Sequence, residues 1–221
     1  MNVLEAIKGR ISTRAYLDKP VTDETIRKIL EVARWSPSGG NTQPWKVAVV
    51  RDEALARLRE AMLARAVEGE NPAPDYVYFP GEWVTPYKER RFQCGMDLYK
   101  ALGIGREDKD KRLEAALNNY RFFGAPVSLF FFMDKALGQG SWLDMGMFIQ
   151  SVMLAAREFG LGSCPQVSIA DYPDLVREVT GIPDDHLLLC GLALGYPDED
   201  HPVNRYRTER EKVEDFSVWV K

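Results

Sequence analysis

The sequence predicts a mixed α/β layer fold built as one domain. Apolar stretches typical of buried strands are separated by stretches with helical periodicity, and this alternation runs along the whole chain. The length of 221 residues suits one domain, with room for an inserted subdomain. Hydrophobic residues make up 45% and charged residues 28%, so the chain has enough apolar surface for a sizeable core.

The first half of the chain contains one clearly bounded helix. Thr22 is expected to cap its N-terminus, and two acidic residues follow in the first turn, where they suit the helix dipole. Four apolar residues then recur with helical spacing, which extends the helix to about Trp35: Ile26, Ile29, Leu30 and Ala33. Around this helix we expect a helix over residues 2–8, extended chain over 10–18, a strand over 46–51 and a helix over 52–67.

Residues 69–88 differ in character from what precedes them. They contain four prolines, which interrupt regular structure, and five aromatic residues, which need apolar surface to cover: Pro72, Pro74, Pro80 and Pro86, with Tyr76, Tyr78, Phe79, Trp83 and Tyr87. This composition fits a lid over a pocket, and it fits equally well a surface excursion that packs on the domain.

The second half of the chain is dominated by fully buried elements. The stretch "APVSLFFFMD" at 125–134 is apolar at consecutive positions, which predicts a strand covered on both faces. A helix over 141–160, ended by Gly160, is apolar nearly all round and is therefore central or part of an oligomer interface. The other expected elements are helices over 88–102, 107–119 and 172–180, the last ended by Gly181, and a buried strand over 187–197.

Composition argues against several classes of function. The net charge of −4, with no basic run among aromatics, does not favour nucleic acid as a partner. With only two histidines, a His-rich metal centre or a Ser/His/Asp triad is not indicated. The three cysteines are widely spaced and form no CxxC pair, so we expect incidental or buried thiols rather than disulfides: Cys94, Cys164 and Cys190.

Two features of the sequence argue against a signal segment or a membrane span. The N-terminal stretch "MNVLEAIKGRISTRAY" has no apolar signal region, and the longest apolar run, at 125–133, is too short to span a bilayer. We therefore expect a cytoplasmic protein.

The segment "GRISTRAY" is the first of three candidate ligand contacts. Side chains alternate along extended chain, so Arg10, Ser12 and Arg14 point the same way. Two guanidiniums that flank a hydroxyl suit a phosphate, because each arginine offers a forked pair of donors. The alternative is a solvated strand face.

The loop in "SPSGGNTQPWKVAVV", residues 36–50, is the second. Gly39 and Gly40 let the backbone approach a flat ligand, and Asn41 and Gln43 can both donate and accept hydrogen bonds. Trp45 is expected to anchor the loop to the sheet. The alternative is a plain turn.

The C-terminal stretch "NRYRTERE" is the third. It carries Arg205, Arg207 and Arg210, which either form a solvated charged tail or close on the same phosphate as the first cluster.

Taken together, these segments resemble the flavin-dependent nitroreductase family. The resemblance begins with "RISTRAYLDKPVTDETIRKILEVARWSPSGGNTQPWKVAVV" and continues with "FFGAPV" at 122–127 and "WLDMGMFIQSVMLAAREFGLGSCPQ" at 142–166, then "GLALGYPD" and the Arg-rich tail. It covers residues 1–221 as a single nitroreductase-like domain. It is weakest over roughly 69–122, where a variable lid or insert is expected.

The resemblance implies an α+β sandwich, with a central antiparallel or mixed sheet flanked by helices, that works as an intertwined homodimer. One FMN would lie at each of two sites in the dimer interface. The segment with Arg10, Ser12 and Arg14 matches the contacts to the FMN phosphate, ribityl chain and pyrimidine edge. Arg207 and Arg210 match the phosphate contacts of the tail, with Arg205 as the alternative register.

Two further segments complete the implied site. The loop that the other subunit lays against the flavin is matched by Pro37, Ser38, Gly39 and Asn41, and the segment that faces the ring near N5 by Pro165 and Gln166. Some family members contact the ring through an Asn and a Lys where this chain reads "YKERRF". That departure leaves Arg14, Arg90 and Arg91 as candidates for the N1/O2 edge, with Arg14 preferred. Asp144 lies near the expected flavin. It either has a structural role, such as capping a helix, or belongs to the site.

The implied activity is an NAD(P)H oxidoreductase reaction of the nitroreductase type. NADH or NADPH would deliver hydride to flavin N5, and a nitroaromatic compound, quinone or related flat acceptor would then take the electrons, with ping-pong kinetics. No catalytic side chain is required, because the flavin carries the chemistry. The alternatives are a flavoenzyme of the same fold with other chemistry, such as a reductive dehalogenase or flavin-handling enzyme, and a non-catalytic flavin-binding protein.

Overall fold

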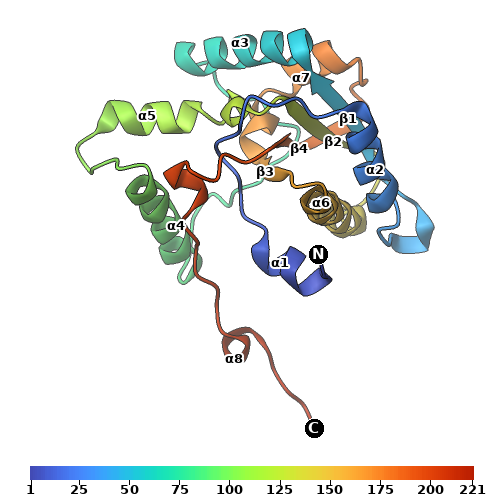
Figure 1. Ribbon diagram of the computed structural model, residues 1–221. Helices are drawn as coiled ribbons and strands as arrows, with labels where there is room; N and C mark the ends of the chain where they lie inside the picture. The colour runs from blue at the N-terminus through green and yellow to red at the C-terminus, as the bar shows by residue number, and fades with distance from the viewer.

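A four-stranded antiparallel sheet lies at the centre of the computed structural model, which describes residues 1–221 (Figure 1). The strands lie in the order β1-β2-β4-β3, and every neighbouring pair is antiparallel. Their bounds are β1 (Lys46–Arg51), β2 (Val127–Asp134), β3 (Gly162–Gln166) and β4 (His186–Gly195). Of the two sheet types left open by the sequence, the antiparallel one is therefore correct.

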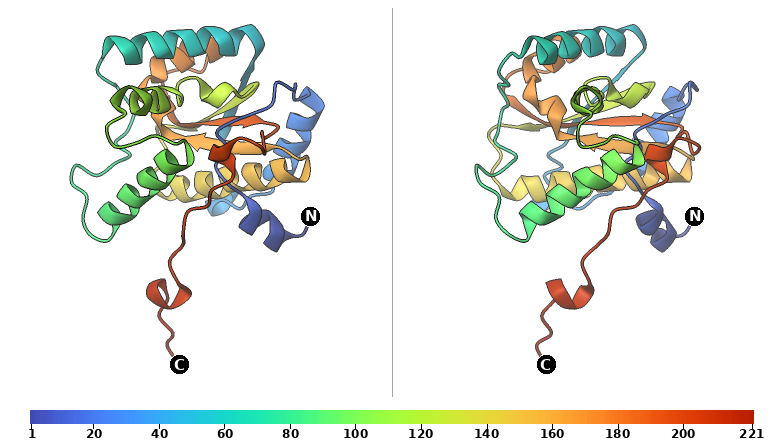
Figure 2. Two further views of the ribbon diagram at one scale, coloured as in Figure 1. Left: turned by 60° about the vertical axis from the view of Figure 1, so that its left-hand side comes forward. Right: turned by 90° about the vertical axis from the view of Figure 1, so that its left-hand side faces the viewer.

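Helices cover both faces of this sheet (Figure 2). Apolar residues of α3 and α7 pack on one face, and those of α2 and α6 pack on the other. The helices are α1 (Val3–Gly9), α2 (Asp23–Ala33), α3 (Asp52–Glu68), α4 (Tyr87–Ala101), α5 (Lys109–Leu117), α6 (Gly140–Glu158), α7 (Pro173–Thr180) and α8 (Val213–Phe216). None of them combines the length and the apolar character that crossing a bilayer requires.

Strand β2 is buried on both faces, as its sequence predicts. Phe130 and Phe132 point into the core under α3 and α7, while Leu129 and Phe131 point into the core over α2 and α6. Phe131 meets Phe148 of α6 edge-on, with ring centroids 6.1 Å apart. Two cores thus share one strand, which is why the run of aromatic residues has no polar alternation.

Most element boundaries agree with the sequence pattern to within two residues. Thr22 caps α2 by accepting a hydrogen bond from the Thr25 amide, and Gly181 ends α7 in the left-handed conformation. The helix expected to reach Trp35 ends at Ala33 instead, because the chain turns there and leaves the Trp35 side chain exposed.

The sequence did not predict strand β3. Its residues, Gly-Ser-Cys-Pro-Gln, have little strand propensity, and a proline is normally confined to a sheet edge. The segment is extended because β4 offers it a free edge, with Gly162 opposite Gly195 and Gln166 opposite Gly191. Long-range pairing therefore outweighs local preference at this position. The short helix α8 was likewise not predicted.

Residues 10–14 run alongside β3 at very close range. The Thr13 amide donates to the Ser163 carbonyl over 3.0 Å, and Ser12 bridges Ser163 in parallel orientation. A Cβ at position 162 would lie 2.4 Å from Thr13 Oγ1 and 2.9 Å from Thr13 Cβ. Only glycine at 162 permits this approach, because the Thr13 side chain is itself buried.

Gly162→Ala is therefore expected to destabilise the protein by about 1–3 kcal/mol, the usual cost of an overpacked interior. Thermal unfolding followed by circular dichroism should show a Tm lower by roughly 2–4 °C for each kcal/mol in a chain of this size. Gly138→Ala is the matched control, since a Cβ there meets nothing within 4 Å. Equal Tm values for the two variants would contradict the close approach.

Candidate cofactor-binding site

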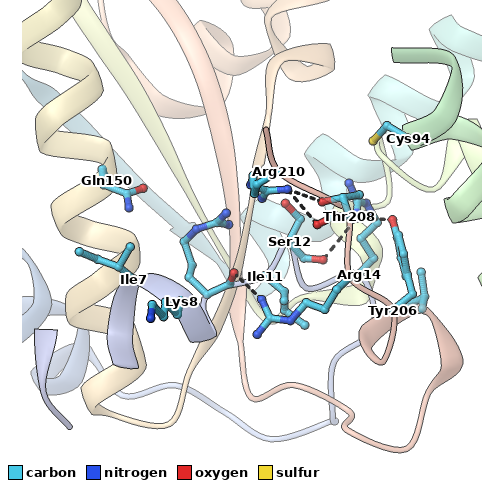
Figure 3. A pocket seen from close by; sticks show the side chains of 13 residues that line it. Ile7, Lys8, Ile11, Ser12, Arg14, Cys94, Gln150, Tyr206, Thr208 and Arg210 are labelled. Atoms are coloured by element: carbon cyan, nitrogen blue, oxygen red, sulfur yellow. Dashed lines mark hydrogen bonds between the residues drawn. The ribbon is translucent and has the colours of Figure 1, made fainter. Parts of the chain in front are cut away.

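Residues 7–14, near the N-terminus, and residues 203–210, before the C-terminal tail, meet at a cavity of about 660 Å³. Figure 3 shows α1 and α6 on one side of it and α4 on the other, with extended chain between them. The lining comes from α1, residues 10–14, α4, α6 and the C-terminal segment: Ile7, Lys8, Arg10, Ile11, Ser12, Arg14, Cys94, Gln150, Val203, Tyr206, Arg207, Thr208 and Arg210. Its volume falls in the range of small-molecule and cofactor sites.

The charge of this cavity is entirely positive. Five of the lining residues are cationic and none is acidic: Lys8, Arg10, Arg14, Arg207 and Arg210. Burial lowers the pKa of Arg10, and the neighbouring positive charge of Arg210 lowers it further. Cations that repel one another across a cavity are stabilised when an anion binds between them, so this charge distribution favours an anionic ligand.

Hydrogen bonds hold the C-terminal segment against the N-terminal one. Arg207 donates to the carbonyls of Gly9 and Arg10, over 3.2 and 3.1 Å. Asn204 accepts from the Arg14 amide over 2.9 Å and donates to the Ala15 carbonyl over 2.8 Å. Segments almost 200 positions apart in sequence are therefore joined directly beside the cavity.

The tail arginines predicted from the sequence separate into two groups. Arg207 and Arg210 line the cavity. Arg205 does not, since its guanidinium donates to Asp200 over 2.5 Å and to the Glu199 carbonyl over 2.9 Å.

The three arginines considered for the flavin N1/O2 edge also differ in whether they line the cavity. Arg14 lines the cavity, where it donates to the Tyr206 hydroxyl over 3.4 Å. Arg90 pairs with Glu211 over 2.9 Å, and Arg91 lies over the rings of Phe79 and Trp83. Neither Arg90 nor Arg91 lines the cavity.

The loop with Pro37, Ser38, Gly39 and Asn41 does not line the cavity of its own chain. Asp144 of α6 accepts a hydrogen bond from the Gly39 amide over 3.2 Å, which gives this buried acid a structural role. Gly40, Asn41 and Gln43 adopt positive φ angles of 58°, 56° and 49°. Because Asp144 and Ser38 accept hydrogen bonds from loop amides, this conformation is held in place.

Trp45 was expected to fix the loop to the sheet, and its principal partner is different. Its ring stacks on Phe148 of α6, with centroids 4.6 Å apart and planes within 4°. The loop is thus fixed to α6 at both Asp144 and Phe148.

Pro165 and Gln166 line a second cavity, of about 460 Å³. Gln166 is buried at the end of β3 and donates through Nε2 to the Asn119 carbonyl over 2.7 Å. The opposite wall of this cavity is the aromatic stretch from Tyr76 to Phe79. The segment that was expected to face a ring therefore lies beside the segment for which a lid was one of two interpretations.

Four polar residues of the first cavity were not predicted from the sequence: Lys8, Gln150, Tyr206 and Thr208. Gln150 carried a usable signal, because it is a polar residue in a helix that is otherwise apolar nearly all round. Tyr206 lies between two of the tail arginines. Nothing in the sequence distinguished Lys8 from a solvated helix residue.

Comparison with known proteins agrees with this geometry. The family model described as the nitroreductase family matches residues 7–196. This chain belongs to the nitroreductase family. A 4-nitrobenzoate reductase from Pseudomonas putida is 36% identical over 214 residues, which are 97% of this chain and 93% of the relative.

Two solved nitroreductase structures are similar over nearly their whole length. One is the FMN and NADPH-dependent nitroreductase NfnB from Sphigopyxis sp. strain HMH, with 42% identity, a TM-score of 0.97 and full coverage of both chains. The other is the FMN-dependent nitroreductase NfnB from Mycobacterium smegmatis in complex with NADPH, with 35% identity and a TM-score of 0.93, covering 99% of this chain and 97% of the other. The resemblance seen in the sequence is confirmed, and so is the expected fold.

The three cysteines of this nitroreductase differ strongly in environment. Cys94 is exposed on α4 at the edge of the first cavity, and no disulfide links it to Cys164 or Cys190. Burial raises the pKa of the Cys190 thiol to about 12 and also raises the pKa of Cys164. Since the thiolate is the reactive form, the two thiols are protected because burial keeps reagents away from them and because they stay protonated.

A thiol reagent at pH 8 is therefore expected to label one cysteine in each native chain, Cys94, and all three only after unfolding in guanidinium. The absorbance of the thiolate that the reagent releases gives the number of labelled cysteines, and mass spectrometry identifies which cysteines they are. Cys94→Ser should abolish labelling of the native protein. Rapid labelling of Cys190 in the folded chain would contradict its buried, protonated state.

Proposed function

We propose that this nitroreductase binds FMN, oxidises NADPH or NADH, and reduces nitroaromatic compounds, with quinones and related flat acceptors as further substrates. The observation that carries the proposal is the cavity in which five cations and no acid converge from both ends of the chain. The Sphigopyxis relative, 42% identical over its full length, is FMN and NADPH-dependent, and the Pseudomonas relative acts on 4-nitrobenzoate. The nicotinamide reductant makes the cytoplasm the expected location.

The residues of the first cavity fit the phosphate end of FMN. We assign the phosphate to Arg10, Arg207 and Arg210, because charge-assisted and bidentate hydrogen bonds from arginine suit phosphate oxygens. The lowered pKa of Arg10 supports this assignment, since the repulsion that contributes to it is relieved by a bound dianion. Ser12 adds an uncharged hydroxyl to the same wall.

Redox chemistry in the proposed enzyme comes from FMN when it is bound, while the chain supplies position and electrostatics. We assign Arg14 to the pyrimidine edge, where a fixed cation stabilises negative charge that develops during reduction. Its guanidinium is held in place by the Ser12 carbonyl at 3.3 Å and by the Tyr206 hydroxyl. We assign Pro165 and Gln166 to the ring near N5. No side chain of the chain is required as acid or base.

The proposed active form is an intertwined homodimer. The tail leaves the body of the molecule and ends far from it (Figure 1), with exposed apolar side chains that suit burial against a partner: Phe216, Val218, Trp219 and Val220. Helix α6 also exposes Leu143 and Met147. In such a dimer the loop with Pro37, Ser38, Gly39 and Asn41, which does not line the cationic cavity of its own chain, is expected to reach the partner's FMN.

An absorption spectrum of the purified protein, recorded before and after anaerobic NADPH, tests the proposed activity. We expect a flavin band that bleaches on addition of NADPH or NADH and returns when 4-nitrobenzoate is added. Ping-pong steady-state kinetics should accompany this cycle, because reductant and acceptor would use one site in turn. A flavin band that neither nicotinamide bleaches would overturn the reductase activity and leave the cofactor assignment intact. Protein that stays colourless after incubation with FMN would overturn both.

The phosphate assignment predicts that Arg10→Ala combined with Arg207→Ala loses FMN and keeps the fold. Each hydrogen bond to a charged group contributes about 1.5–3 kcal/mol. The double variant should therefore bind FMN at least ~100-fold more weakly, as tenfold corresponds to about 1.4 kcal/mol. Quenching of FMN fluorescence gives the Kd, and circular dichroism checks the fold.

Arg205→Ala is the matched control for that experiment, because Arg205 is a neighbouring tail arginine that pairs with Asp200 outside the cavity. It should bind FMN as the wild type does. If the double variant retained stoichiometric FMN, the phosphate assignment would be wrong.

A further inference from the structure

The segment between α3 and α4 divides into an attached part and a free part. Residues 70–76 are joined to the body of the protein by hydrogen bonds at four positions, Glu70, Ala73, Asp75 and Tyr76. Residues 77–83 make no hydrogen bond with the rest of the protein. This segment runs along the outside of the molecule (Figure 2). We call residues 77–83 the flap.

Asp75 is the most strongly held residue of the attached part. Its Oδ2 accepts hydrogen bonds from Arg177 Nη2 over 2.5 Å and from the Leu188 amide over 2.8 Å. The side chains of Asp75 and Arg177 are only 9% and 12% exposed, so this ion pair lies largely out of water. Arg177 also donates to the His186 carbonyl over 2.6 Å, which fixes the guanidinium from a second side. Breaking a buried pair by changing one partner leaves an uncompensated charge.

Tyr76 is also attached to strand β4, next to the contact that Asp75 makes there. Its hydroxyl donates to the Leu189 carbonyl over 2.5 Å, and burial raises the pKa of the hydroxyl, so it remains a donor. Strand β3 pairs with β4 only from Gly191 to Gly195, so the preceding residues of β4 have no β3 residue opposite them. The side chains of Asp75 and Tyr76 thus satisfy backbone groups at Leu188 and Leu189 that a longer β3 would otherwise take.

This attachment sets the position of an aromatic wall. The Tyr76 ring packs edge-on against Trp142, with centroids 4.7 Å apart, and it lines the 460 Å³ cavity together with Pro165 and Gln166. Within the flap, Tyr78 meets Phe79 at 4.8 Å, and Phe79 meets Trp83 at 5.7 Å. Beyond Tyr76 the flap is therefore held by these ring contacts and by Arg91, which lies over the rings of Phe79 and Trp83.

We propose that Asp75, Tyr76 and Arg177 are positioning residues that fix the base of the flap, and that the flap forms the wall against which a flat aromatic acceptor stacks beside Pro165 and Gln166. The inference rests on the proposed function and deepens it by naming what orders the acceptor subsite. Stacking on aromatic rings selects flat ligands. Asp75 and Arg177 do not line the cavity, so they fix its geometry without touching the acceptor.

Two conservative variants test the attachment. Tyr76→Phe removes one hydroxyl and keeps the ring, and Asp75→Asn removes the charge and keeps the shape. Asp184→Asn is the matched control. Its carboxylate lies 3.3 Å from Arg177 Nε but is 94% exposed, so the control changes an acidic neighbour of the same arginine without altering the attachment.

With 4-nitrobenzoate as acceptor and NADPH as reductant, KM is expected to rise roughly tenfold in both test variants, while kcat stays within about twofold. The Kd for FMN should not change, because Asp75 lines neither cavity and Tyr76→Phe keeps the ring that lies beside Pro165 and Gln166. Chymotrypsin should cut after Tyr78 or Trp83 roughly tenfold faster than in wild type, since cleavage follows the open population of a segment. Asp184→Asn should match wild type in every measurement.

Equal KM and cleavage rates in the test variants and in Asp184→Asn would overturn the proposal. Parallel loss of FMN, Tm and activity would also overturn it, since that pattern means a general structural role. The cleavage comparison needs neither cofactor nor turnover, so it decides the attachment even if the proposed reductase activity fails.

Discussion

Burial of β2 on both faces is the constraint on which the rest of the structure depends. A strand with aromatic residues at consecutive positions has no face to offer to water, so helices must cover it from both sides. That requirement places α3 and α7 on one face and α2 and α6 on the other. Within the sheet β1 and β4 are the immediate neighbours of β2, and the edge of β4 is where the functional part of the molecule begins.

The edge strand β3 connects the core to both cavities. Its first residue, Gly162, lets residues 10–14 run alongside, and this brings the N-terminal arginines to the place where the C-terminal segment docks. Its last residues, Pro165 and Gln166, form part of the second cavity. One short strand of poor intrinsic propensity therefore orients the cationic site at one end and the aromatic wall at the other.

Local patterns in the sequence were sufficient to predict most of the helices and strands. The cap at Thr22, the strand over 46–51 and the glycine stop at Gly181 depend on residues within a few positions of one another, and each is found in the structure. Strand β3 could not be predicted, because its partner lies about 30 positions away and its own composition argues against a strand. The arginine clusters were recognised as separate signals, but only the fold shows that Arg207 docks on residues 9 and 10.

The separation of the cationic site between the two ends of the chain has a consequence for biosynthesis. Strand β4 ends at Gly195, whereas the last cavity residues are at 203–210. Because a chain emerges N-terminus first, all four strands have been translated before Arg207 and Arg210 exist. The nascent chain can therefore collapse around β2 while only three of the five cations are present, and a phosphate has no complete site to occupy. Folding of the sheet and loading of the cofactor are in this way ordered in time by the position of a few arginines in the gene product.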